Sequence, residues 1–373
     1  MKANISGLIM KLTSQLKLFS NETIKIKLQN PLYPDKARND LKNKTRLQPI
    51  SDDRDEKLGG ILLAREGMNE SVKALSVVSN GRFIWAVIRQ WLVIVAAISI
   101  ALYLGHWAIY LIMMLVIATR QHALGILMHD ATHYRCLTNH IANDLFCDFF
   151  CALPNGILTS RYRYEHQMHH RFLNTDKDPY WLDFKADEMW SFPKKRKNTL
   201  LIFLGDLIGI NGRKMLKVAH RWSPWTNHFS LKKVPPPLTK IERATVYFFI
   251  ASLLSFIYLT NGWILFLILW VIPLSTFTVA MVRLRTIGEH LGLPNKHELD
   301  ASRHTDGTLL ERLSICPLNI NYHIDHHLFP SVPYYNLPKL HQILLKNSHY
   351  VKNAHLNKTY LGFKNGLLGE ILK

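Results

Sequence analysis

Cysteine and acidic residues are scarce in this sequence, and the common cofactor motifs are missing. The four cysteines, Cys136, Cys147, Cys151 and Cys316, form no CxxC pair and no regular spacing, which argues against a disulfide framework, a zinc ribbon and an iron–sulfur cluster. The sequence also has no glycine-rich nucleotide-binding loop and no haem-binding segment of the HPGG kind. Any electrons that the protein uses must therefore come from another molecule.

Acidic residues are outnumbered by basic ones, 27 to 46, which gives a formal net charge of +19. The basic residues alternate with apolar runs instead of forming one compact basic region with a known reader motif, so the pattern argues against nucleic acid as a partner. Basic loops beside apolar runs are typical of the cytoplasmic face of a membrane protein. The charge therefore indicates orientation.

Four long apolar runs, at residues 83–104, 107–128, 245–260 and 263–281, are each long enough or nearly long enough to cross a bilayer. Gly105-His106 and Asn261-Gly262 separate them into two pairs. The sequence thus predicts an all-α integral membrane protein with four transmembrane helices in two hairpins and a cytosolic helical cap. Residues 1–82 are expected to form a polar, basic cytosolic leader, and residues 83–373 a single domain.

The hairpin tips carry no lysine or arginine, whereas residues 129–244 and 283–373 carry many. The positive-inside rule places both termini and the long loops in the cytoplasm. Two shorter apolar stretches, 145–158 and 200–210, contain Asp148 and Asp206 and are expected to be in-plane or buried helices. A single extra span would put the histidine clusters described next on opposite faces of the membrane.

Eight of the nineteen histidines fall in three short clusters. These are HDATH at residues 129–133, HQMHH at 166–170 and HIDHH at 323–327, with ligand candidates His129, His133, His166, His169, His170, His323, His326 and His327. Spacings of three and four residues place side chains on one face of a helix. Eight imidazoles exceed what one four-coordinate ion can use, so two metal ions are expected.

Zinc is the simplest alternative metal, because two histidines four residues apart on a helix also occur in zinc peptidases. Those enzymes have a glutamate after the first histidine, whereas Asp130 follows His129 here. Zinc also has no redox chemistry, and a nitrogen-rich site beside apolar spans suits O2-dependent attack on an unactivated chain. The pattern therefore favours two iron ions, with O2 as a co-substrate.

In order and position, the three clusters resemble the histidine boxes of the membrane fatty acid desaturase and hydroxylase superfamily, over about residues 83–345. The resemblance implies O2-dependent desaturation of a fatty acyl chain at a di-iron centre, with electrons from a ferredoxin or a cytochrome b5. It also implies a ninth ligand, His290, in the segment RTIGEH. Some relatives have an asparagine one helical turn earlier, where this chain has Thr286.

Histidine ligands need acceptors for their second N–H group, which carboxylates and amides can provide. The candidates are Asp130, Glu165, Asp178, Glu289, Asp325 and Asn321. Isolated histidines such as His341 and His349 are expected to be ordinary surface or core residues.

Two other functions remain open at this point. A hydroxylase or carotenoid ketolase could use the same di-iron scaffold, because the placement of the substrate decides the product. A non-enzymatic membrane metal carrier is more remote, because it would need a path of ionisable residues along the spans, which carry few charges.

Overall fold

The computed structural model describes residues 68–227, 235–295 and 298–373. The predicted leader lies mostly outside these residues. Its described part contains α4 (Asn69–Leu75) and the beginning of α5.

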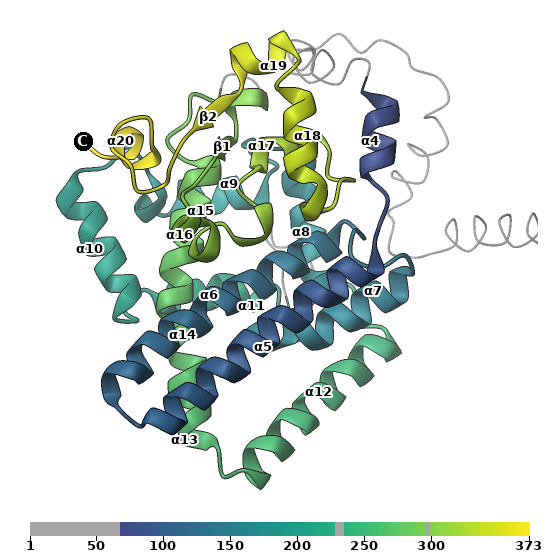
Figure 1. Cartoon of the computed structure of the whole chain (residues 1–373), viewed down its shortest axis with the longest axis vertical. Coiled ribbons are helices and arrows are strands. Elements are labelled where there is room, and N and C mark those ends of the chain that lie inside the picture. The colour runs from purple at the N-terminus through teal and green to yellow at the C-terminus, as the bar shows by residue number, and fades with distance from the viewer. Residues whose placement is uncertain (1–67, 228–234, 296–297) are drawn as a thin grey trace, which may run out of the picture. The chain divides into compact units, whose positions relative to one another are not determined.

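Within the described residues, four long helices are apolar enough to cross a membrane, judged by their length and composition. They are α5 (Asn80–Leu104), α6 (Trp107–Thr132), α12 (Lys240–Leu259) and a fourth that runs from Trp263 to His290 (Figure 1). The fourth consists of α13 (Trp263–Phe266), the π-helical turn η5 (Leu267–Val271), α14 (Ile272–Ser275) and α15 (Phe277–His290). The prediction of a mainly helical chain with four possible spans is confirmed.

All four helices extend beyond the predicted apolar runs, and two of them do so at their C-terminal ends. The second continues from residue 128 to Thr132, and the fourth continues from residue 281 to His290. The apolar pattern stops earlier because the added turns bury polar residues, including Asp130, Arg283 and Glu289, against other parts of the protein. The two extensions carry the predicted ligands His129 and His290 out of the apolar segments.

The turn between α5 and α6 is set by Gly105 and His106. Gly105 adopts a left-handed conformation with φ of 58°, which glycine tolerates best, and the His106 side chain caps α6 by accepting a hydrogen bond from the Ala108 N–H. The two helices then pack side by side (Figure 1), with Ala97, Ala101 and Ile117 buried at their contact. Small alanine side chains allow the close approach.

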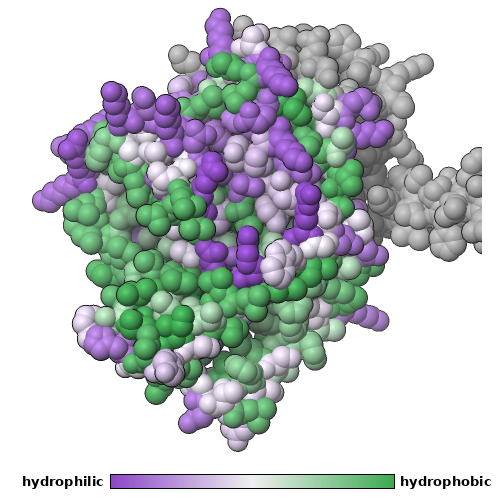
Figure 2. Space-filling view, in the orientation of Figure 1, coloured by the Kyte–Doolittle hydropathy of each residue, from purple (hydrophilic) through white to green (hydrophobic). Residues whose placement is uncertain are grey.

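A level of polar side chains crosses the middle of this helix pair. Gln90 accepts a hydrogen bond of 2.9 Å from Arg120, whose guanidinium also donates to the Leu313 carbonyl. Gln121 donates to the Trp270 carbonyl at 2.9 Å. From this level onward α6 is buried inside the protein, with Leu124 and Leu127 in its hydrophobic core. Figure 2 shows the same division on the surface, with hydrophobic residues over α5 and α12 and hydrophilic residues over α18 and α19.

The remaining elements are short. Between α6 and α12 they are α7 (His140–Cys147), η1 (Asp148–Ala152), η2 (Leu153–Asn155), α8 (Thr159–Arg171), α9 (Pro179–Ala186), η3 (Glu188–Trp190), α10 (Arg196–Leu207) and α11 (Gly212–His220). After α15 they are η6 (Glu298–Asp300), β1 (Arg303–Thr305), α16 (Leu309–Ser314), η7 (Pro317–Asn319), α17 (His323–Leu328), η8 (Tyr334–Asn336), α18 (Leu337–Leu344), α19 (Ser348–Asn353), β2 (His355–Asn357) and α20 (Leu367–Ile371). Strands β1 and β2 pair in parallel, with Arg303 opposite His355.

The two shorter apolar stretches are not candidate spans. Residues 145–158 form the end of α7 and the tight turns η1 and η2, where the buried Asp148 accepts a hydrogen bond from the Thr159 N–H at 2.8 Å. Residues 200–210 belong largely to α10, whose leucines are exposed and whose buried Asp206 pairs with Arg283 on α15. The ion pair fixes α10 to the side of the fourth long helix.

Candidate metal centre

The structure brings all nine predicted ligands together in two neighbouring groups. Within each group one potential ligand atom of every histidine lies within 4.8 Å of the others. The five-histidine group consists of His129, His133, His166, His170 and His326, and the four-histidine group consists of His169, His290, His323 and His327.

Helix geometry explains how each cluster is divided between the groups. Residues four apart on a helix differ by about 40° and those three apart by about 60° in the opposite sense. On α8, His166 and His170 therefore join the five-histidine group, while His169 faces the other. On α17 the division is reversed, with His323 and His327 in the four-histidine group and His326 in the five-histidine group.

The long helices supply the remaining ligands. His129 and His133, at the end of α6, complete the five-histidine group, and His290, at the end of α15, completes the four-histidine group. Thr286, one helical turn before His290, has no imidazole and so adds no nitrogen ligand to the four-histidine group. The two groups are thus built alike, except that the four-histidine group lacks one imidazole.

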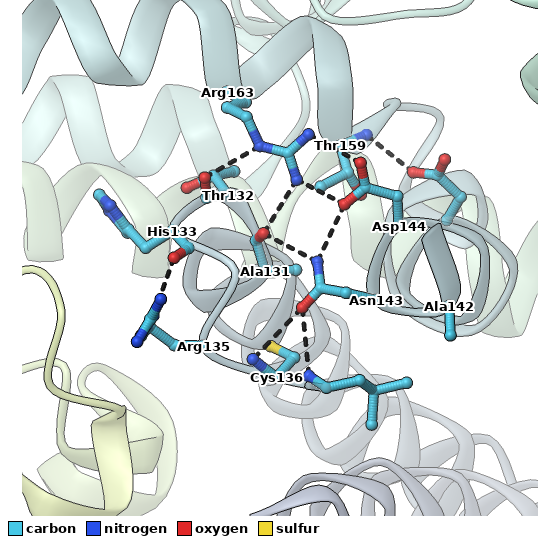
Figure 3. Close-up of polar contacts among 12 residues, drawn as sticks. Ala131, Thr132, His133, Arg135, Cys136, Ala142, Asn143, Asp144, Thr159 and Arg163 are labelled. Carbon is cyan, nitrogen blue, oxygen red and sulfur yellow. Dashed lines mark hydrogen bonds and ion pairs between the residues drawn. The ribbon is translucent and has the colours of Figure 1, made fainter. Parts of the chain in front are cut away.

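The end of α6 is held in place by an arginine and an asparagine that sequence reasoning missed (Figure 3). Arg163 of α8 donates to the carbonyls of Thr132 at 2.9 Å and Ala131 at 3.0 Å, and it also pairs with Asp144. Asn143 donates to the same Ala131 carbonyl at 3.0 Å. These bonds satisfy carbonyls that a helix end leaves without partners, and a cation there also complements the helix dipole. They tie the first cluster to the helix that carries the second.

The ring nitrogens face one another at short range. In the five-histidine group, the Nε2 atoms of His133 and His170 each lie 3.0 Å from that of His166. In the four-histidine group, Nε2 of His323 lies 2.8 Å from that of His290 and 3.1 Å from that of His327.

Neutral imidazoles alone cannot fully satisfy this arrangement. A ring with its proton on Nε2 can donate to one neighbouring Nε2, but its own Nδ1 then has no proton, and two rings with their protons on Nδ1 have Nε2 lone pairs that face each other. The Nδ1 atoms of His166, His170, His323 and His326 are buried and have no hydrogen-bond partner within the described residues. A cation between the Nε2 atoms removes the conflict, so the donor set fits a metal ion in each group.

Burial also keeps the imidazoles in the form that binds metals. It lowers the pKa of His326 to about 3, with smaller contributions from His169 and Arg285. Burial likewise holds the pKa values of His166 and His323 well below their ordinary range, assisted by neighbouring histidines. The rings are therefore neutral at physiological pH, as metal coordination requires.

Asp178 is the best-placed of the predicted supporting residues. Its carboxylate lies 2.9 Å from Nδ1 of His169 and is fully buried. The same carboxylate accepts from the N–H groups of Asn174 and Tyr180, each at 2.9 Å. Such a bond fixes the ring orientation and leaves Nε2 free for a metal.

Two other predicted carboxylates are close to ligands without a hydrogen bond to them. Glu289 lies 3.6 Å from Nδ1 of His323, and Asp130 lies 4.0 Å from Nδ1 of His129. Asp130 accepts instead from the Tyr334 N–H at 2.9 Å. Neither carboxylate therefore fixes the ring of its neighbouring histidine by a hydrogen bond.

The other three predicted supporting residues have different partners. Glu165 accepts a hydrogen bond from the Trp222 indole at 2.8 Å, and Asn321 donates to the Asp306 carbonyl at 3.3 Å. The side chain of Asp325 points away from its neighbouring histidines, because helix positions 323, 326 and 327 share one face and 325 does not.

Asp325 instead binds His341, an isolated histidine that was expected to be an ordinary surface or core residue. The carboxylate lies 2.8 Å from Nδ1 of His341 and accepts from the Tyr350 hydroxyl. His304 stacks on His341, with ring centroids 4.3 Å apart, and all of these side chains are buried. This network joins α17 to α18 and α19 and so supports the third cluster from behind.

Comparison with known proteins identifies the class. The sequence matches the family described as Fatty acid desaturase over residues 105–358, a range that contains all nine predicted histidine ligands. The chain belongs to this family, and it is an oxidoreductase of fatty acid metabolism.

Individual relatives are distant. The chain is 24% identical to a dihydrorhizobitoxine desaturase of Bradyrhizobium elkanii over 70% of this chain and 75% of that protein. It is 30% identical to a chloroplastic omega-6 fatty acid desaturase of Glycine max over 61% of this chain and 55% of the plant protein. It is 25% identical to a ferredoxin-dependent sn-1 acyl-lipid omega-3 desaturase of a Nostoc species over 67% of this chain and 71% of that protein. The match spans about half the length of the plant enzymes.

Proposed function

We propose that the protein inserts a C=C bond into a fatty acyl chain in an O2-dependent reaction at two iron ions held by the nine histidines. The observation that carries the proposal is the division of these histidines into two adjacent groups whose Nε2 atoms converge. Membership of the desaturase family supports the same reaction class. Residues 83–373 would form the catalytic domain.

The spacing of the nitrogens favours a metal with right-angled ligands over tetrahedral zinc. Two nitrogens at about 2.1 Å from a metal lie about 3.0 Å apart at right angles and about 3.4 Å apart at tetrahedral angles. The separations between His166 and His133, and between His323 and His290, are 3.0 and 2.8 Å. Four or five imidazoles per group also exceed the usual zinc set.

The protein's own residues would hold and orient this centre. When bound, the two irons would supply redox chemistry with O2 that can remove two hydrogens from an unactivated acyl chain. His169 would be fixed in one tautomer by Asp178, and the end of α6 by Arg163. The position of the chain against this rigid centre would then decide which carbons react, because small displacements change the outcome strongly.

The level of Gln90 and Arg120 supports a position of the centre just outside the bilayer. Charged groups are unfavourable in hydrocarbon, and Arg120 bonds to α16, which does not belong to a span. α6 then continues for about two and a half turns beyond this level to His129 and for about three and a half turns to His133. Together with the basic loops, this supports two hairpins with the termini and the histidine cap on the cytoplasmic side.

The electron donor would be a separate protein of the ferredoxin or cytochrome b5 type, because the sequence contains no motif for a redox cofactor other than the metal site. One relative is named as ferredoxin-dependent and as acting on acyl lipids. We extend both properties to this chain, with an acyl chain of a membrane lipid as the substrate.

The direct test is the fatty-acid profile of cells that express the full chain, with and without O2. New double bonds that form only with O2 support the proposal, whereas new hydroxyl groups would assign a hydroxylase. His129→Ala and His326→Ala should abolish the product and lower the iron content while the protein still inserts into membranes. Full activity in both variants would refute the site.

A further inference from the structure

A candidate ligand-binding site, separate from the histidine groups, lies beside the beginning of α5. A cavity of about 400 Å³ separates the first turns of this helix from the segment that contains η7 and η8. Arg82, Trp85 and Arg89 line one wall. Asn319 and Tyr335 line the other, although they follow more than 200 residues later in the sequence.

The two arginines point the same way. Positions seven residues apart on a helix differ by about 20° in direction and by about 10 Å along the axis, so Arg82 and Arg89 share one face. Both side chains are exposed. Among the residues that the structure describes, no carboxylate forms an ion pair with either. The Arg82 guanidinium carbon lies 5.1 Å from the centre of the Tyr335 ring, which holds it over the cavity.

Membrane anchoring alone does not account for this arrangement. An arginine near the end of a span can extend toward the polar interface and needs no protein partner. Here two guanidinium groups face an amide and a phenol ring across a concave space, which is the composition of a ligand site. In the same wall, Leu318 has a positive φ of 57°, a conformation that leucine rarely adopts.

The cavity is connected to the metal centre through one residue. Tyr334 lines the cavity, and its N–H donates to Asp130, the neighbour of the ligand His129. Beyond Arg89 on α5, the exposed side chains of Leu92 and Val95 are apolar and belong to the possible span. If the anionic end of a ligand binds between the arginines, its apolar part can therefore lie along α5 in the hydrocarbon of the bilayer.

We propose that Arg82 and Arg89 bind the phosphate of a glycerophospholipid, and that an acyl chain of this lipid is the substrate of the histidine centre. Guanidinium groups match phosphate with paired, charge-assisted hydrogen bonds. A phosphate located at the level of a span belongs to a bilayer lipid more readily than to a water-soluble thioester. The inference rests on the proposed desaturase function, and it excludes a galactolipid, which has no phosphate.

Lipid binding tests the proposal independently of catalysis. The full-length protein is extracted mildly from phosphatidylglycerol nanodiscs, and retained phospholipid per chain is measured by native mass spectrometry. The double variant Arg82→Gln/Arg89→Gln should retain about tenfold less phospholipid, or lower still, because hydrogen bonds to charged groups are lost. The double lysine variant should retain an intermediate amount, since charge remains without the paired geometry. Arg243→Gln, at the beginning of α12, is the matched control and should retain as much as the wild type.

Equal retention by the wild type and the double glutamine variant would overturn the proposal, as would an equal loss in Arg243→Gln. Preferential retention of a galactolipid with the same acyl chains would also overturn it. A phosphopantetheine thioester that displaces the phospholipid and is itself desaturated would assign the arginines to a soluble carrier instead. Iron content is measured on the same samples: two irons with unchanged lipid binding refute the headgroup site alone, whereas a protein without iron or product refutes the desaturase function.

Discussion

Replacing Asp178 by asparagine should weaken metal binding in the four-histidine group and leave the fold largely intact. One oxygen of Asp178 accepts from His169 and from the Asn174 N–H, and the other accepts from the Tyr180 N–H. An asparagine side chain has one oxygen, so its amide nitrogen must face at least one of these donors. The orientation that keeps His169 paired breaks only the bond to Tyr180, but it still removes the negative charge behind the imidazole.

The expected size of the effect follows from the position of Asp178. Changes of a residue that orients a metal ligand typically lower metal affinity by about 10- to 100-fold, equivalent to about 1.4–2.7 kcal/mol. The assay is a chelator titration of purified, iron-loaded protein, with iron per chain measured by mass spectrometry. About one of two irons should be released at a 10- to 100-fold lower chelator concentration than in the wild type.

Asp176→Asn is the matched control, because the Asp176 side chain is 80% exposed and its ion pair among the described residues is with Lys185. Its iron should be released as in the wild type. An Asp178→Asn protein that holds both irons as tightly as this control would refute the assigned role of Asp178. Simultaneous release of both irons would show that the two groups do not bind independently.

Three further predictions follow from the contacts. Burial lowers the pKa of His326 to about 3, so the unfolded chain binds a proton at this residue at a higher pH than the folded chain does. At pH 5.5 the metal-free protein should therefore lose about 1.4 kcal/mol of unfolding free energy through His326. The loss should appear as a decrease in Tm, and bound iron should make that decrease smaller. Arg163→Ala should lower unfolding free energy by about 2–4 kcal/mol and reduce iron content, because helix-end carbonyls lose their donor, whereas the exposed Arg171→Ala should change neither. His341→Ala should lower stability by about 1–3 kcal/mol because the buried Asp325 loses a partner, while His349→Ala should be nearly silent in activity and in thermal unfolding.

The long apolar runs and the clustered histidines were predictable because their signals are local. A span needs only a sufficient apolar run, and spacings of three and four residues fix which histidines share a helix face. The ends of α6 and α15 were not predictable in the same way. Asp130, Arg283 and Glu289 interrupt the apolar pattern, yet the helices continue because distant segments bury these residues.

The supporting residues were harder to predict because sequence proximity to a ligand does not determine side-chain direction. Asp325 stands between two ligands but lies on another helix face, where it binds His341. Asp178, eight residues after a ligand, reaches His169 because a turn folds the chain back. Arg163 is three residues before His166, but its role depends on contact with α6, which no local pattern records.

The most direct test of the central claim is the metal content of the purified protein, measured together with variants that each remove one ligand from one group. Protein loaded with iron under reducing conditions should contain two irons per chain. His133→Ala should affect the five-histidine group and His290→Ala the four-histidine group, each leaving about one tightly bound iron. A single iron in the wild type, stoichiometric zinc in its place after anaerobic loading with both metals, or two irons in both variants would contradict the account.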